Sequence, residues 1–477
     1  MIQLTTYQTA KTQILFILFG SLLFVLPAIL NGFPFIFTDT LSYITSGINL
    51  VSPFDRPIFY GLLVRVINVF INLWGVVIFQ AALIAFLLQQ LSSILFPRLA
   101  LAYLYLWLIL ITFLTSVTWF TGQLSPDIFT AILFLAIIIL ALTYQNASIV
   151  KIMSLSVLIT ISVCVHSSNL LIGLIFSSSI IFWFIFQKVS WRVWIKFLVP
   201  VFISFLIAVS LIIASNIRSN YGATLNPVGK VFMLARILED GPGLKYLRER
   251  CKLIELKTCA SLPILEQARL IEVQDPESKS PELRNLVASS FLWGGGLVVS
   301  GGVFSVNEEA GSIIQGSIRA YPIGQFWALV RNMGNQFITF EVGEQFNSTL
   351  KMGAINELIE TYFSELYSSY LNSMQSLEEL VFIVQFLNPI YFFVVIFSVI
   401  SIPCIYVFFW RRNIPLEKIS LTIFSLFIFL SANALISGGL SGVFDRYQSR
   451  VIWLLPTISI LLLLGSLKNL SRVNANK

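Results

Sequence analysis

Long apolar runs separated by short polar breaks make up most of the chain, and this pattern predicts its main elements. A helix needs about 20 apolar residues to cross the hydrocarbon core of a bilayer. We predict ten such spans, at residues 12–31, 72–96, 99–118, 126–144, 149–165, 168–187, 197–215, 381–409, 418–437 and 451–467. A further apolar stretch, 57–70, is predicted to form a short surface helix. The expected fold is therefore an all-α polytopic membrane protein.

The predicted spans fall into two groups. Residues 1–215 are expected to form a membrane module with seven spans, and residues 381–477 a second module with three. Between them, 216–380 is more polar, with helical patterns interrupted by glycine-rich turns such as that at 241–243. We expect this middle region to be mainly helical and to lie outside the membrane, on the outer side.

Composition supports the membrane class. The 477-residue chain is 57% hydrophobic and only 11% charged, whereas soluble domains carry about 25% charged residues. The net charge of +7 could by itself indicate a nucleic-acid partner. The positions of the basic residues indicate a topology signal instead, so we expect membrane lipids and no nucleic acid as partners.

Short cytoplasmic loops are enriched in Lys and Arg. With a cytoplasmic N-terminus, the predicted inner loops carry Lys11, Arg98, Lys151, Lys188, Arg192, Lys196, Arg411, Arg412, Lys418, Lys468, Arg472 and Lys477. The short outer loops carry only Arg56, Arg65, Arg446 and Arg450. Both termini are therefore predicted to be cytoplasmic.

In this topology the conspicuous polar residues fall on the outer side. They are Asp39, Tyr43, Asp55, Arg56, Asp127, His166, Asp445, Arg446 and Arg450. Ionisable groups at the mouth of an apolar bundle are costly to bury and usually functional. The interiors of the spans hold almost none, although ion-coupled transporters need such groups near the midplane. A transporter is therefore disfavoured.

Several of these residues also have a purely structural interpretation. Ser125, Pro126 and Asp127 together resemble a standard helix start, with Ser125 as the N-cap. His166, the only histidine, could bind an anion or cap a helical hairpin. Arg446 and Arg450 could share one helix face and grip a phosphate, or could extend to the lipid interface.

Two further motifs bear on chemistry and compartment. A single histidine excludes the zinc motif H-E-x-x-H. Cys251 and Cys259 both lie in the outer region, eight residues apart, and we expect them to form a disulfide if that compartment is oxidising.

Four short motifs, placed by this topology, resemble a known superfamily. They are D-T-x-x-Y at 39–43, R-P-x-x-Y-G-L-L at 56–63, S-P-D at 125–127 and D-R-Y at 445–447. The chain resembles the GT-C superfamily of membrane glycosyltransferases over residues 12–187 and, more weakly, in the last span. That superfamily includes protein O-mannosyltransferases and lipid A aminoarabinose transferases. The resemblance implies a polyprenyl-linked sugar donor and a catalytic aspartate in the first outer loop, here Asp39.

The resemblance leads to a specific hypothesis. Asp39 is the catalytic base, Arg56, Arg446 or Arg450 holds the donor phosphate, and His166 assists. Tyr43, Asp55, Asp127 and Asp445 are further candidate substrate contacts. The enzyme would transfer a glycosyl unit from polyprenyl phosphate to a lipid or glycan acceptor, in a bacterial inner membrane. No cofactor is predicted; many members carry a second acid next to the aspartate, but here Thr40 follows Asp39, so a divalent metal is left open.

Two alternatives stand beside this hypothesis. One is a lipid-linked glycan polymerase or ligase of another family, usually marked by arginine and histidine in a large outer loop. The region 216–380 has arginines but no histidine. The other is a non-enzymatic membrane scaffold or lipid-binding protein, which would not depend on the Asp39 carboxylate.

Overall fold

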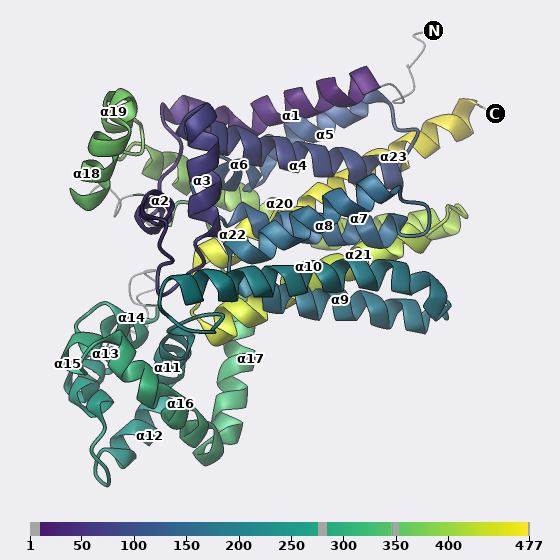
Figure 1. The fold of residues 1–477 in the computed structure, drawn as a ribbon. Helices are drawn as coiled ribbons and strands as arrows, with labels where there is room; N and C mark the ends of the chain where they lie inside the picture. The colour runs from purple at the N-terminus through teal and green to yellow at the C-terminus, as the bar shows by residue number, and fades with distance from the viewer. Residues whose placement is uncertain (1–9, 275–283, 345, 347–352, 476–477) are drawn as a thin grey trace. The chain divides into compact units, whose positions relative to one another are not determined.

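The structure is a computed structural model that describes residues 10–274, 284–344, 346 and 353–475, without the side chains of 468–475. Of the basic residues used to predict orientation, Lys477 and the side chains of Lys468 and Arg472 lie outside this description. Every regular element in the described part is a helix (Figure 1). Extended pairing there is limited to one parallel bridge between Phe35 and Gln123. The predicted all-α class is confirmed.

In chain order, the helices fall into three groups. The first group comprises α1 (Ala10–Asn31), α2 (Thr40–Asn49), α3 (Phe59–Phe70), α4 (Leu73–Leu95), α5 (Leu101–Leu114), α6 (Val117–Thr121), α7 (Ile128–Thr143), α8 (Ile149–Val165), α9 (Ser168–Phe186) and α10 (Trp191–Arg218). The middle group comprises α11 (Gly229–Glu239), α12 (Pro242–Arg250), η1 (Lys257–Ser261), α13 (Leu262–Gln274), α14 (Leu286–Leu292), α15 (Gly296–Val299), α16 (Val303–Ala320) and α17 (Pro322–Ile338). The last group comprises α18 (Gly353–Tyr362), α19 (Ser364–Leu371), α20 (Leu380–Arg411), α21 (Glu417–Leu440), α22 (Asp445–Ile452) and α23 (Leu454–Ala475).

Seven segments of the described chain are long and apolar enough to cross a membrane. They are α1, α4, α9, α10, α20, α21 and the stretch Asp445–Leu467. Three other predicted spans correspond to the shorter apolar helices α5, α7 and α8, and the predicted surface helix corresponds to α3. An integral membrane protein is thus supported, while the count of ten and the orientation stay predictions. The predicted span 99–118 is wrong as one helix, because Thr115 is extended and separates α5 from α6.

The chain divides into two compact units. Unit 1 contains residues 1–223, 341–429 and 449–477, and unit 2 contains 224–340 and 430–448. The predicted outer region 216–380 therefore differs from unit 2, since 341–380 belongs to unit 1. The reason is a set of hydrogen bonds between distant segments: the Gln375 side chain pairs with the backbone of Ile36, and its own N–H donates to Asn31 Oδ1 at 2.7 Å.

The core of unit 1 is organised around α7. Residues 128–141 of this helix are all buried, as expected for a helix that is apolar on every side. It packs against α4, α8 and α9. The ring of Phe134 lies 5.3 Å from that of Phe176 and 5.0 Å from that of Phe429. Because α7 is enclosed, Asp127 at its start is held inside the protein.

The loop between α1 and α2 is fixed against the segment that precedes α7. The N–H of Phe35 donates to Gly122 O at 2.9 Å, and the N–H of Leu124 donates to Phe35 O at 2.9 Å. The hydroxyl of Thr40 donates to Leu124 O at 2.9 Å. Asp39 and Asp127, far apart in sequence, therefore sit on two segments that pack together.

Helices α2 and α3 approach closely through two glycines, Gly47 and Gly61. A methyl group on Gly61 would overlap the carbonyl oxygen of Tyr43 and the hydroxyl of Ser46. Such overlap forces side chains or backbone to shift. The glycine after the tyrosine in R-P-x-x-Y-G-L-L thus allows α2 to rest on α3, which fixes the position of Tyr43.

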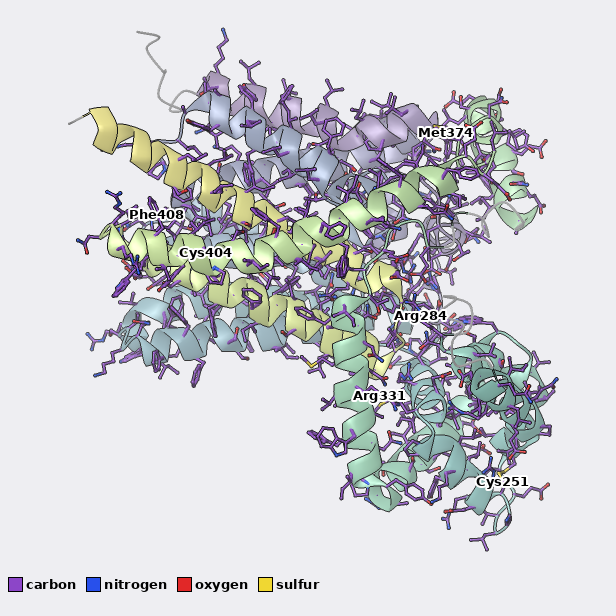
Figure 2. All side chains as sticks on the ribbon, turned by 180° about the vertical axis from the view of Figure 1, so that it is seen from behind. Cys251, Arg284, Arg331, Met374, Cys404 and Phe408 are labelled. Carbon is purple, nitrogen blue, oxygen red and sulfur yellow. A yellow bond between two sulfur atoms is a disulfide. The ribbon has the colours of Figure 1, made fainter. Side chains whose placement is uncertain are left out.

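Unit 2 is built around α11, which packs against α12, α14 and α16. Cys251 and Cys259 form a disulfide with a Cα–Cα distance of 5.7 Å, and Figure 2 labels Cys251. The adjoining turn is held by Glu309 of α16, whose carboxylate accepts from the N–H groups of Lys257 and Thr258. The disulfide and this carboxylate together hold the turn against α16.

A pair of carboxyl groups, Glu239 and Glu272, lies inside unit 2. The N–H of Ala288 donates to Glu239 Oε2 at 2.8 Å, and Arg269 pairs with Glu272 at 2.6 Å. Burial, a hydrogen bond from Glu272 and the like charge of Glu272 raise the pKa of Glu239 to about 7, despite the opposing effect of Arg236. The two groups therefore share a proton at moderately acidic pH.

This pair predicts a pH dependence of stability. The folded state binds the shared proton more tightly than the unfolded chain, whose carboxyl titrates near 4.5. The free energy of unfolding should therefore fall as the pH rises from about 4.5 to about 7. Glu239→Gln keeps the acceptor for Ala288 and removes the titration. Between pH 5 and 8, the midpoint temperature of thermal unfolding should change less with pH for this variant than for the wild type. At pH 8 the variant should be the more stable of the two.

Glu266→Gln is the matched control, because Glu266 is exposed and pairs with Arg248 at the surface. In this control, the unfolding temperature should change with pH as it does in the wild type. An unchanged slope in Glu239→Gln would show that the carboxyl pair does not control the pH dependence.

Candidate functional site

The first cluster of charged groups lies at the loop before α3 and is named the Arg56 cluster. Arg56 Nη1 lies 3.0 Å from Asp39 Oδ1, and Arg56 Nη2 lies 2.6 Å from Asp55 Oδ2. The guanidinium also lies over the Tyr43 ring, 5.0 Å from its centroid. One cation is thus held by two carboxylates and an aromatic face, all from residues 39–56.

Local structure directs Asp39 toward this cluster. Asp39 stands at the N-cap position of α2, where an aspartate commonly accepts from a backbone N–H of the first turn. Its side chain makes no such cap hydrogen bond and pairs with Arg56 instead. On the other side, the loop is attached to the end of α10, since the N–H of Ser52 donates to Ser219 Oγ at 2.9 Å.

The Arg56 cluster is partly accessible. The exposed fractions of the side chains are 26% for Asp39, 18% for Arg56 and 11% for Asp55. Burial disfavours the charged guanidinium, but Asp39, Tyr43 and Asp55 together raise the pKa of Arg56 above its ordinary value. Arg56 therefore stays charged, and its side chain is 18% exposed.

The second cluster, named the Arg450 cluster, is buried. Arg450 Nη1 donates to Asp127 Oδ1 at 2.9 Å and to His166 Nε2 at 3.0 Å. The exposed fractions are 0% for Arg450 and 3% for Asp127. Ser125, predicted as a helix cap, donates through its hydroxyl to Asp127 Oδ2 at 2.9 Å. Ser125 Oγ also accepts from the N–H of Asp127 at 3.3 Å, as expected for a helix cap, whereas the Asp127 side chain makes no cap hydrogen bond.

Both ring nitrogens of His166 have polar neighbours. Nε2 lies 3.0 Å from Arg450 Nη1, and because a guanidinium can only donate, Nε2 is the acceptor. Nδ1 lies 2.9 Å from Ser168 Oγ and 3.4 Å from the backbone N of Ser168. His166 ends α8 as the C-cap residue.

Aromatic rings connect the two clusters. The Tyr43 and Tyr60 rings are 5.2 Å apart, and the Tyr60 and Phe129 rings are 6.3 Å apart. Phe129 follows Asp127 by two positions. The Tyr60 hydroxyl donates to Gln80 Oε1 at 2.9 Å. Tyr60, held by Gln80, thus contacts a residue of the first cluster and a residue close in sequence to Asp127 of the second.

Asp445 and Arg446 lie in unit 2 and form contacts within it. Asp445 pairs with Arg284 at 3.1 Å, with 6% of its side chain exposed, and Figure 2 labels Arg284. The Arg446 guanidinium lies over the ring of Tyr447, 5.2 Å from its centroid. Of the predicted site residues, unit 1 thus groups Asp39, Tyr43, Asp55 and Arg56 in one cluster and Asp127, His166 and Arg450 in another.

Sequence reasoning missed several partners. Tyr60, Gln80 and Tyr221 are not among the predicted site residues, although Tyr60 is part of the R-P-x-x-Y motif. Tyr221 follows α10, and burial together with the charge of Asp55 raises the pKa of its hydroxyl. No local signal identifies Arg284 as the partner of Asp445, because 161 positions separate them.

The side chains of the Arg56 cluster do not resemble a metal site. Among the described residues there is no group of three or more His, Cys, Asp or Glu side chains suited to a metal ion. Asp39 and Asp55 face the Arg56 guanidinium, which supplies the positive charge between them.

Comparison with known proteins found no matching family model, no matching curated protein and no matching solved structure.

Proposed function

We propose that this chain is an integral-membrane glycosyltransferase that moves a glycosyl unit from a polyprenyl-phosphate donor to a lipid or glycan acceptor. The observation that carries the proposal is the contact between Asp39 and Arg56, a partly accessible acid and cation 3.0 Å apart. It is supported by the resemblance of the flanking motifs to GT-C enzymes and by the apolar helices that would accommodate a lipid tail.

Each member of the Arg56 cluster has a role in this proposal. Arg56 binds the donor phosphate, for which a planar guanidinium is well suited. As the phosphate approaches, it competes with Asp39 for the guanidinium. Asp39, released from part of its ion pair, then accepts the proton of the acceptor hydroxyl. Asp55 keeps its contact at 2.6 Å and holds Arg56 in place during this exchange.

The transfer step balances without an added co-reactant. The bond between the anomeric carbon and the phosphate oxygen breaks, and its electron pair stays on the phosphate beside Arg56. The anomeric carbon forms a bond with the acceptor oxygen, and the proton of that hydroxyl passes to Asp39. Positive charge placed where negative charge develops is the largest contribution expected from such a site.

Arg450 is proposed to organise this site from within the protein. In the structure it is fully buried and paired with Asp127 and His166. This arrangement supports Arg56, among the arginines named from the sequence, as the group that binds the donor phosphate.

The proposal is tested by donor binding. Undecaprenyl phosphate is the probe, and its affinity for the purified protein is measured by native mass spectrometry from micelles. Arg56→Gln should weaken binding by about tenfold or more, because a hydrogen bond to a charged group contributes about 1.5–3 kcal/mol. Arg56→Lys should bind with intermediate affinity, since it keeps the charge but not the paired donors.

Arg98→Gln is the matched control, because Arg98 is exposed and lies outside both clusters. It should bind the probe like the wild type. Equal affinities for the wild type and Arg56→Gln would contradict the role of Arg56. Turnover measured as release of polyprenyl phosphate from polyprenyl-phosphate sugars distinguishes an enzyme from a lipid-binding scaffold.

A further inference from the structure

Helix α17 of unit 2 exposes an apolar stripe along one face. The side chains of Ile323, Phe326, Trp327, Val330 and Ile338 are 73%, 57%, 63%, 41% and 69% exposed. Ile323, Phe326, Trp327 and Val330 recur at the three- and four-residue spacing that puts side chains on one side of a helix, and Ile338 lies on the same side about two turns later. Because α17 has 17 residues, the stripe runs along most of its length.

The opposite face of α17 is occupied. Its residues Ala328, Asn332 and Gln336 are buried. The Gln336 side chain holds the backbone of Phe444, donating to its O at 2.8 Å and accepting from its N–H at 3.0 Å. Helix α17 therefore packs against the rest of unit 2 through this buried face, and the apolar stripe is not needed for that packing.

The buried face of α17 packs against the end of a membrane-spanning helix. Gly438, near the end of α21, lies against Gln336 and Asn332, and Gly439 lies against Leu329. A side chain at either glycine would overlap α17. Residues 430–448 and α17 belong to the same compact unit. Helix α17 is thus attached where the candidate span Glu417–Leu440 ends, which is where a bilayer meets water.

The composition of α17 fits that boundary. Helices that lie in the plane of the membrane surface carry one apolar face bearing aromatic residues, which is buried about 5–10 Å into the boundary of headgroups and acyl chains. Tryptophan is enriched at this depth. The helix contains Arg331 and no acidic residue, and Arg331 is exposed. Figure 2 labels Arg331 on α17, and its long side chain can reach lipid phosphates.

We propose that α17 is an interfacial helix whose apolar stripe binds the lipid bilayer surface. This inference goes beyond the proposed transferase activity and does not depend on it. The helix joins unit 2 to the membrane in addition to the covalent connections of the chain. Lipid is favoured over a protein partner because the stripe lies on a helix fixed to the end of a span and carries no acidic group.

The test uses full-length protein in nanodiscs of phosphatidylcholine and phosphatidylglycerol, one copy per disc. In a Cys404→Ser background, Phe326→Cys and Val330→Cys are labelled with nitrobenzoxadiazole. Both positions are exposed, so the label does not disturb packing. Gln315→Cys on α16, also exposed, is the matched control. Quenching by doxyl-labelled lipid and by aqueous iodide is measured for all three.

The proposal expects several-fold stronger quenching by doxyl lipid at 326 and 330 than at 315, with the opposite order for iodide. Equal lipid quenching at the three positions, or full access of iodide to 326 and 330, would overturn it. Iodide access in single-copy discs would show that water covers the stripe. The stripe would then be free to bind a protein partner or a second copy of the chain, and not the bilayer. Retention of the Cys251–Cys259 disulfide, checked in unreduced peptides, confirms that each variant is folded.

Discussion

Replacing Asp39 by asparagine is expected to lower transfer activity by about 10²-fold or more, because a positioned general base contributes that much to rate. The amide keeps the shape of the carboxylate but cannot accept the acceptor's proton. Binding of undecaprenyl phosphate should persist, since Arg56 is retained. The loss should therefore appear in turnover and not in donor affinity. Release of polyprenyl phosphate and native mass spectrometry measure the two quantities.

Asp55→Asn is the matched control for this experiment. Asp55 holds the same guanidinium, with an Arg56–Asp55 distance of 2.6 Å, so the change perturbs Arg56 without removing the proposed base. It should reduce turnover less than Asp39→Asn. Equal losses would indicate that the cluster acts only by positioning Arg56. Full activity in Asp39→Asn would exclude Asp39 as the base and favour the scaffold hypothesis.

Replacing Arg450 by methionine is expected to have the largest effect on stability. Asp127 would remain buried, at 3% exposure, without the cation that neutralises it. Breaking a buried pair by removing one partner costs about 3–5 kcal/mol. The variant should unfold at a markedly lower temperature in detergent micelles or express poorly. His166 would also lose the donor to its Nε2 atom, 3.0 Å away.

The double variant Asp127→Asn with Arg450→Met tests the cause of that loss. Without the uncompensated carboxylate, part of the stability should return, so the two changes should not be additive. A double variant as unstable as the sum of the single ones would show that Arg450 acts through packing alone. Arg56→Met serves as a comparison, and its smaller expected cost follows from the partial exposure of its partners.

The two arginines illustrate how far sequence patterns reach. Asp39 and Arg56 lie on either side of the short helix α2, so their proximity could be expected from their positions. Sequence spacing groups Arg450 with Arg446, because the two are four positions apart on one helix. In the structure, Arg450 enters the core of unit 1, while Arg446 stacks on Tyr447 in unit 2. Helical spacing indicates which residues share a face but not what lies opposite that face.

Domain boundaries show the same limit. Polarity along the chain separates 216–380 from the spans, and the contacts of unit 2 include most of that region. Residues 341–380 nevertheless pack in unit 1, because Gln375 completes the hydrogen bonds of the backbone at Ile36. Composition indicates which segments are too polar for apolar surroundings. It does not indicate which backbone N–H and C=O groups will form hydrogen bonds with a polar side chain that is distant in the sequence.

The sequence by itself determined that this protein is helical and suited to a membrane, because long apolar runs leave the backbone no better arrangement than helices in lipid. It also indicated the candidate acid Asp39 and the candidate cation Arg56, since only the short helix α2 and a loop separate them along the chain. Only the tertiary structure decided that Arg450 pairs with Asp127 across 323 positions and that Asp445 pairs with Arg284. Buried charges must find partners wherever the fold brings them, and that choice depends on which helices pack together.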